Sequence, residues 1–267
     1  MNRPVEVNSV GQRLLCSFLL ALSTMLFAQD VVPAGTILPL QLDSALNSRK
    51  NKPGQVITAT VMQDVPSATG PQIRAGAKVI GHILSVTQAE HGNGELVTLQ
   101  FDELKVSKHT VPITTNLRAL ASMMDVFDAQ LSDAGPDRGE AGNAWTTDQI
   151  GGEVVYRGGG PVAHGLQVVG KPMANGVLVP TAASPSSGCR GPVAGNYQPQ
   201  ALWVFSSDAC GIYDLPNVEI VHAGRTNPVG TITLLSQKGN LNIRAGSGLL
   251  LRVNNNAPAL ESKNVVK

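Results

Sequence analysis

The chain has 267 residues, of which 42% are hydrophobic, and this is enough for one or two packed domains rather than a disordered chain. Glycine and proline number 28 and 17 and aromatic residues make up only 4%, a balance that favours short strands and turns over long helices. Charged residues make up 15% and the formal net charge is +1, so the basic stripe with interleaved aromatics that nucleic-acid binding needs is missing.

Residues 1–28 have the pattern of a secretory signal peptide. Arg3 and Arg13 precede the apolar stretch LLCSFLLALSTMLF, residues 14–27, and the small residue Ala28 follows it. The stretch is shorter than the about 20 residues that span a bilayer. Cys16 lies near its front, without the small preceding residue that a lipid attachment site needs. We therefore expect a periplasmic or secreted protein that keeps no transmembrane anchor after signal cleavage.

Three short segments of the chain resemble one another, and each contains an Ala-Gly step followed by an apolar run. They are VVPAGTILPLQL at 31–42, QIRAGAKVIGHI at 72–83 and NIRAGSGLLLRV at 242–253. A glycine after an extended entry can adopt a positive φ and form a tight turn or bulge where a strand begins. We therefore expect Gly35, Gly76 and Gly246 to be structural turns at the start of three strands.

Residues 29–115 are expected to form a β-domain. The segment QVITATVMQDV, residues 55–65, carries apolar side chains on both faces, as in a strand inside a barrel or sandwich. In LVTLQFDELKV, residues 96–106, the apolar alternation changes phase after Asp102-Glu103, which predicts a β-bulge.

Residues 116–153 are expected to hold one short amphipathic helix and a polar linker. Apolar residues recur at three- and four-residue spacing over about four helical turns, namely Leu117, Leu120, Met124, Phe127 and Leu131. We interpret this stripe as packing on the β-domain, and the alternative is a helix that binds a partner or a membrane. Polar, glycine-rich sequence follows to about Gly152.

Residues 154–253 are expected to form a second β segment that completes the same sheet, and residues 254–267 a disordered tail. Cys189 and Cys210 both lie among Gly, Ser and Pro residues, and in an exported chain this pattern predicts a disulfide bond. A metal site has less support, because the histidines show none of the spacings of zinc ligands. These are His82, His91, His109, His164 and His222.

The first part of the chain resembles a known family. The order and spacing of VPAGTILPLQLDSALNS, PGQVITATVMQDV and QIRAGAKVIGHI are similar to the β-domain of TrbI-like proteins of bacterial conjugation and type IV secretion. The matching positions are Val32, Pro33, Gly35, Thr36, Leu42, Ser48, Pro53, Gly54, Ala59, Val61, Gly76 and Gly81. LVTLQFDEL and HTVPI match the next hairpin of that domain, so the resemblance covers residues of about 31–114.

The resemblance implies an all-β domain, a barrel or sandwich, that serves as an assembly scaffold in the cell envelope. Family members generally carry an inner-membrane helix and a proline-rich stretch before this domain, whereas here a signal peptide leads directly into it. They also insert a helical hairpin that crosses the outer membrane. The stripe at 117–131 contains Asp125 and Asp128 and is too short to do so.

Three classes of function remain open at the level of sequence. We expect an exported, non-enzymatic envelope protein that binds protein partners or itself and needs no cofactor. The alternative is a secreted hydrolase or a small-ligand-binding module that acts at the cell wall. The sequence contains no G-x-S-x-G, H-E-x-x-H or P-loop motif, and no catalytic residue is predicted.

Several residues are candidates for a ligand site. His164 lies in the glycine-rich segment GGGPVAHG, and Tyr197 and Trp203 are aromatic residues near the predicted disulfide. Ser206-Ser207-Asp208 and Asp102-Glu103 could also be drawn into a site, but turn chemistry and the bulge explain them more simply.

Overall fold

The computed structural model describes residues 32–67, 72–88, 94–131, 147–156, 161–164, 166–185, 188–189 and 193–254. All of them belong to a unit that begins at Val31. The predicted signal peptide, residues 132–146 of the predicted linker and residues 255–267 of the predicted tail lie outside the described residues.

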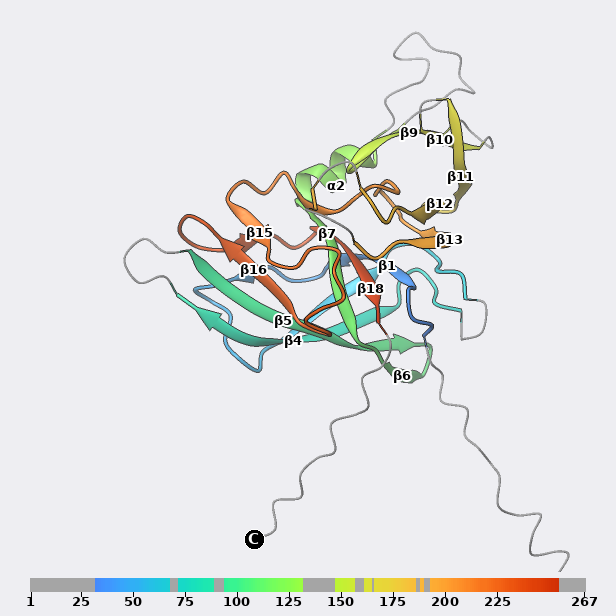
Figure 1. The fold of residues 1–267 in the computed structure, drawn as a ribbon. Helices are drawn as coiled ribbons and strands as arrows, with labels where there is room; N and C mark the ends of the chain where they lie inside the picture. Colours follow the sequence, from blue (N-terminus) through green and yellow to red (C-terminus); the bar gives the residue numbers. More distant parts are fainter. Residues whose placement is uncertain are drawn as a thin grey trace, which may run out of the picture. The chain divides into compact units, whose positions relative to one another are not determined.

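The fold is all-β, as the composition predicts, and most of its strands belong to one ten-stranded sheet, the main sheet (Figure 1). Its hydrogen-bonded order is β14 (Gly211–Tyr213), β7 (Thr115–Ala121), β18 (Gly248–Val253), β1 (Ile37–Leu42), β3 (Val56–Val61), β4 (Lys78–Thr87), β5 (Glu95–Val106), β16 (Ile232–Ser236) and β15 (Val218–Ile220), and β6 (His109–Pro112) pairs with β5. β14 and β15 end this order without pairing to each other, so the described strands form a sandwich-like fold rather than a closed barrel.

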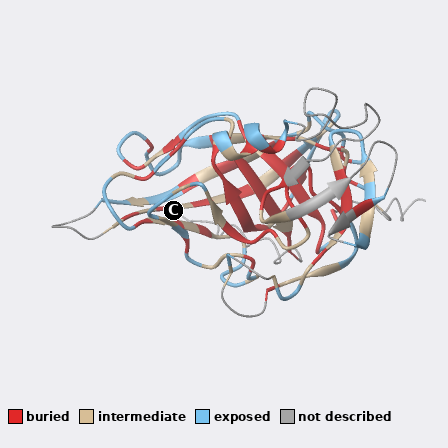
Figure 2. Cartoon of the chain, turned by 90° about the horizontal axis from the view of Figure 1, so that it is seen from above, coloured by how far each residue is buried: buried red, intermediate tan, exposed pale blue. Residues whose placement is uncertain are grey.

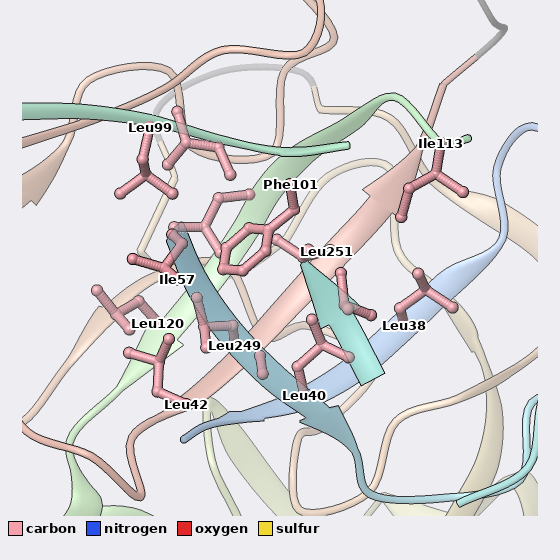
Figure 3. Close-up of a cluster of buried hydrophobic side chains, with 14 of the residues drawn as sticks. Leu38, Leu40, Leu42, Ile57, Leu99, Phe101, Ile113, Leu120, Leu249 and Leu251 are labelled. Carbon is pink, nitrogen blue, oxygen red and sulfur yellow. The ribbon is translucent and has the colours of Figure 1, made fainter. Parts of the chain in front are cut away.

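One face of the main sheet buries a large apolar cluster, the first core. Alternate residues from β1, β3, β4, β5, β7, β16 and β18 all contribute to it, so the sheet must curl around these side chains. Leu40, Phe101 and Leu251 lie together although they are far apart in the sequence (Figure 3). The predicted bulge is present, because β5 carries Asp102 as an extra residue where its pairing with β4 shifts between Ile80 and Gly81.

The Ala-Gly repeats build strand-entry corners with the same hydrogen bonds. Gly35, Gly76 and Gly246 have φ values of +86°, +89° and +88°. Each lies at the third position of a four-residue turn closed by a backbone hydrogen bond, the type II arrangement that requires a positive φ. Each glycine N–H also donates to the last carbonyl of the neighbouring strand, over N···O distances of 2.7–2.8 Å.

A fourth corner of this kind precedes β3. It is not among the three similar segments of the sequence, because Pro53-Gly54 stands there in place of Ala-Gly. Gly54 has a φ of +82°, and its N–H donates to the Ile83 carbonyl of β4 at 2.8 Å. The corners form two reciprocal pairs, one between β1 and β18 and one between β3 and β4. The three Ala-Gly corners and the Pro53-Gly54 corner therefore fix the ends of four adjacent strands, which is a structural role.

A second, six-stranded sheet comes from the later part of the chain. Its order is β13 (Asn196–Ala201), β12 (Gly176–Thr181), β11 (Gln167–Met173), β10 (Val162–His164), β9 (Gly152–Tyr156) and β8 (Thr147–Gln149). A short pair, β2 (Leu46–Asn47) with β17 (Asn242–Ile243), forms a separate two-stranded sheet. The predicted second β segment, residues 154–253, is thus divided, because only β14, β15, β16 and β18 join the main sheet.

The opposite face of β1, β7 and β18 is covered by a second core. Ile37, Ala119 and Leu250 of the main sheet pack there with residues of β12 and of the segment 202–209. The Gln200 side chain also accepts a hydrogen bond from the Ile37 amide at 2.9 Å. These three strands are therefore buried on both faces, and Figure 2 shows buried residues running along strands in the middle of the view.

The helix predicted from Leu117 to Leu131 is wrong for its first part. Residues 115–121 form β7, which is buried throughout between β18 and β14, so tertiary pairing overrides the helical spacing. The helix α2 (Met123–Ala129) begins only after Ser122, whose Oγ accepts a hydrogen bond from the Asp125 amide at 3.0 Å.

Leu117 and Leu120 of the stripe pack in the first core from β7, whereas its later residues do not pack on the β-domain as expected. The change from strand to helix at Ser122 alters which side chains share a face, and α2 buries Val126 and Ala129 instead. Its apolar residues Met124 and Phe127 are 48% and 55% exposed. None of the described helices is long and apolar enough to cross a membrane.

Candidate functional site

The two ends of the main sheet face one another across a groove. This β14–β15 groove has a volume of about 350 Å³. It is lined by Gly188, Cys189, Gly211, Ile212, Val218, Glu219, Ile220, Val221, Ala223, Arg225 and Gln237. The sheet leaves the groove open because β14 pairs only with β7 and β15 only with β16 among the described strands.

The hydrogen-bonding register of β15 turns two backbone groups away from β16, on the side of the groove that β15 lines, and no described residue pairs with them. The Gln237 amide donates to the Asn217 carbonyl at 2.7 Å and the Val221 amide to the Thr233 carbonyl at 3.0 Å. In an antiparallel pair, every second residue directs its backbone groups toward the partner strand. The Val218 carbonyl and the Ile220 amide lie at the alternate positions and point away from β16. An N–H and a C=O group on one open strand edge can receive another extended segment.

The wall formed by β14 offers the same kind of edge. Ser122 follows β7, and its amide donates to the Tyr213 carbonyl at 3.1 Å. The backbone groups of Tyr213 therefore face β7. In a parallel pair the backbone groups of successive residues face opposite sides of the strand. Those of Ile212, which precedes Tyr213, therefore point away from β7 and toward the groove. The Ile212 and Val218 side chains are half-buried there and give the groove an apolar floor.

Both signs of charge occur at the rim of the groove. Glu219 and Gln237 are exposed, and the Gln237 side-chain amide lies 3.5 Å from the Glu219 carboxylate. Arg225, also exposed, supplies a guanidinium on the loop between β15 and β16. A polar rim around an apolar floor is typical of protein-binding surfaces.

The predicted disulfide is confirmed and lies at the β14 side of the groove. Cys189 and Cys210 are bonded across a sequence separation of 21, and their Cα atoms are 5.3 Å apart. The Tyr213 hydroxyl accepts from the Cys210 amide at 2.9 Å and donates to the Cys210 carbonyl at 3.0 Å. The disulfide and this tyrosine therefore fix the start of β14 and one wall of the groove.

Arg118 holds together the irregular segments behind that wall. The residue is 1% exposed, and its guanidinium donates to four backbone carbonyls instead of a carboxylate. These are the carbonyls of Ala209 at 2.8 Å, Ala194 at 3.0 Å, Ala182 at 2.9 Å and Ser207 at 3.3 Å. Burial lowers the pKa of Arg118 to about 10, so it still carries its charge at neutral pH.

The aromatic candidates from the sequence do not assemble into a site, and the side chain of the candidate His164 lies outside the described part of the structure. Trp203 is 3% exposed and belongs to the second core, where its amide donates to the Gln63 side chain at 2.7 Å. Tyr197 is 90% exposed on β13. The backbone of His164 pairs with Gln167 in the hairpin of β10 and β11. Neither Trp203 nor Tyr197 lines the β14–β15 groove.

The two acidic segments also have structural surroundings. Asp102 is the bulge residue of β5; it accepts a hydrogen bond from the Gln100 amide at 2.8 Å and lies 3.2 Å from His82 Nδ1. Ser206 is 3% exposed, and Ser207 contributes its carbonyl to Arg118. Within the described ranges no three His, Cys, Asp or Glu side chains gather in a way that could hold a metal ion.

Sequence reasoning missed the groove and Arg118 for different reasons. The groove exists because β14 and β15 end the strand order, and no local pattern states which strands remain unpaired. Arg118 stands in the ordinary apolar strand TNLRALA, where a single arginine resembles a solvated side chain. Its partners come from segments 64 to 91 residues away in the sequence.

Comparison with known proteins does not assign the chain to a family. No protein-family profile and no curated protein sequence matches it.

Proposed function

We propose that the chain is an exported, non-enzymatic protein of the cell envelope whose β-fold is an assembly scaffold. In this proposal the β14–β15 groove binds an extended segment of a protein partner, which adds to the edge of β15. The observation that carries the proposal is the pair of unpaired groups on β15, the Ile220 amide and the Val218 carbonyl, above an apolar floor. Backbone hydrogen bonds along such an edge supply affinity, and the neighbouring side chains supply specificity.

Three further observations support export and a scaffold role. The disulfide indicates folding in an oxidising compartment outside the cytosol. Residues 1–28 have the pattern of a cleaved signal peptide. The resemblance of residues of about 31–114 to the TrbI-like β-domain favours an assembly role in conjugation or secretion machinery.

Export is tested by the N-terminus of the protein recovered from the periplasm or the medium. Intact-mass and N-terminal peptide analysis should find a chain that begins near Gln29. A chain that retains Met1 in the membrane fraction would contradict cleavage and would support an anchored protein.

Partner binding is tested by photo-crosslinking in the cells that produce the protein. A photoreactive phenylalanine at Glu219, exposed at the groove, should form a discrete crosslinked species with an envelope protein. The matched control is the same amino acid at Val56, which is 54% exposed on β3 and does not line the groove. Equal crosslinking from both positions, or none from position 219, would contradict binding in the groove.

A further inference from the structure

A second cavity lies where the first strand-entry corner meets the end of β18. It has a volume of about 340 Å³, separate from the groove, and is lined by Ala34, Thr226, Asn227, Val229, Arg252 and Asn254. Apart from Ala34 and Val229, the described side chains of the lining carry hydrogen-bond donors, and none of them is acidic. Arg252 is the single cation among these described side chains, so we name it the Arg252 cavity.

The guanidinium of Arg252 is half-buried, and no described residue supplies a counter-ion to it. Its Nη1 donates to the Asn254 side-chain oxygen at 3.3 Å, and Nε is buried without a hydrogen-bond partner. No carboxylate of the described residues comes within 4.0 Å of it. Burial lowers the pKa of Arg252, because the charged form has lost part of its hydration.

A chain of amides holds Arg252 in place. The Asn254 side chain donates to Asn116 Oδ1, and the Asn116 amide donates to the Pro228 carbonyl at 2.8 Å. The Asn254 backbone amide also donates to the Thr114 carbonyl at 2.8 Å. Because Asn254 is fixed from both sides, it orients the guanidinium beside the cavity before any ligand binds, which lowers the entropic cost of binding.

We propose that the Arg252 cavity binds a small oxyanion, a carboxylate or a phosphate group. Arg252 supplies the charge and donates charge-assisted hydrogen bonds from its Nη atoms, and Thr226 and Asn227 donate from the side of the cavity. An oxyanion would neutralise a half-buried charge that the described residues leave uncompensated. This proposal does not depend on partner binding in the β14–β15 groove.

The test uses the mature protein and two probes, inorganic phosphate and acetate. Titration followed by ¹H–¹⁵N NMR of the arginine side chains should shift the Arg252 Nε–H signal and saturate. Arg252→Gln should weaken binding at least tenfold, and Arg252→Lys should weaken it several-fold because lysine keeps the charge but loses the planar fork. The control Arg244→Gln removes an exposed arginine on the turn before β18 and should bind as the wild type does.

The two probes distinguish the chemistry of the ligand. Tighter saturable binding of phosphate points to a phosphate group, and tighter binding of acetate points to a carboxylate. If neither probe saturates in the wild type, or if Arg252→Gln binds as the wild type does, the proposal is wrong. Should Arg252→Gln fail to fold by circular dichroism, Thr226→Val serves instead, since it removes one donor, keeps the shape and should weaken binding several-fold.

Discussion

Replacement of the corner glycines by alanine separates two physical costs that the structure assigns to different corners. At Gly76 a Cβ atom would meet nothing within 4 Å, so only the φ of +89° opposes alanine. A left-handed conformation costs an L-residue about 1–2 kcal/mol, and Gly76→Ala should lower the free energy of unfolding by that amount. Gly54, with a φ of +82° and equally open surroundings, should behave in the same way.

At Gly246 the same substitution carries an additional packing cost. Its Cβ would lie 2.9 Å from Met123 Cγ, at the first residue of α2, so either the methionine or the turn must move. Overpacking of this kind costs about 1–3 kcal/mol. With the backbone cost added, Gly246→Ala should lower the free energy of unfolding by about 2–5 kcal/mol.

Urea unfolding of the purified variants measures these differences as shifts of the midpoint at constant m-value. Two controls isolate the causes. Gly76→Asn should cost less than Gly76→Ala although asparagine is larger, since asparagine tolerates a positive φ. Gly246→Ala placed in a Met123→Ala background should lose its excess cost. Equal losses at positions 76 and 246, or better tolerance of alanine than asparagine at 76, would refute the reasoning.

Three other perturbations address the region around the groove. Arg118→Met should lower the free energy of unfolding by about 3–5 kcal/mol, measured by urea unfolding, because buried carbonyls lose their donor. Replacing both Cys189 and Cys210 by serine should cost about 3 kcal/mol in the same assay, since the closed loop regains entropy in the unfolded chain. Burial and the nearby Asp214 raise the pKa of Asp125, so the native state disfavours its charged form. Asp125→Asn should therefore raise the melting temperature at pH 7, and the gain should vanish below the ordinary aspartate pKa, where Asp125 is protonated in both states.

Local patterns in the sequence were sufficient to predict the β-structure where turn chemistry and alternation agree. The Ala-Gly steps mark strand entries because glycine adopts the required positive φ without strain. The phase change after Asp102-Glu103 marks the bulge because one extra residue reverses the alternation of side chains between the two faces. The cysteine pair was also predictable, from its composition and the expected export.

The apolar pattern of residues 117–131 led to a wrong prediction because it is compatible with both a helix and a strand. Leu117 and Leu120 fit a helical stripe, yet both face the first core from β7, on either side of the shift in its pairing with β18. Burial between two neighbouring strands decides the conformation, and that burial depends on β14 and β18, which lie about 90 to 130 residues later in the sequence.

The candidate site could not be predicted for the same reason. β14 and β15 are only three residues long, and what distinguishes them is that, among the described strands, each lacks a partner on one side. The roles of Arg118 and Arg252 likewise depend on backbone carbonyls and side-chain amides of residues from other segments of the chain. Such features depend on contacts between remote segments, which one sequence does not reveal.

The proposed function depends on the open hydrogen-bonding edge that β15 presents to the β14–β15 groove. Amide hydrogen exchange, measured by NMR on the isolated protein, tests it at two adjacent residues. The Ile220 amide, directed into the groove, should exchange orders of magnitude faster than the Val221 amide, which donates to the Thr233 carbonyl at 3.0 Å. Adding the partner segment identified by crosslinking should protect Ile220 and leave Val221 unchanged. Equal, strong protection of both amides in the isolated protein would contradict an open edge and the scaffold function built on it.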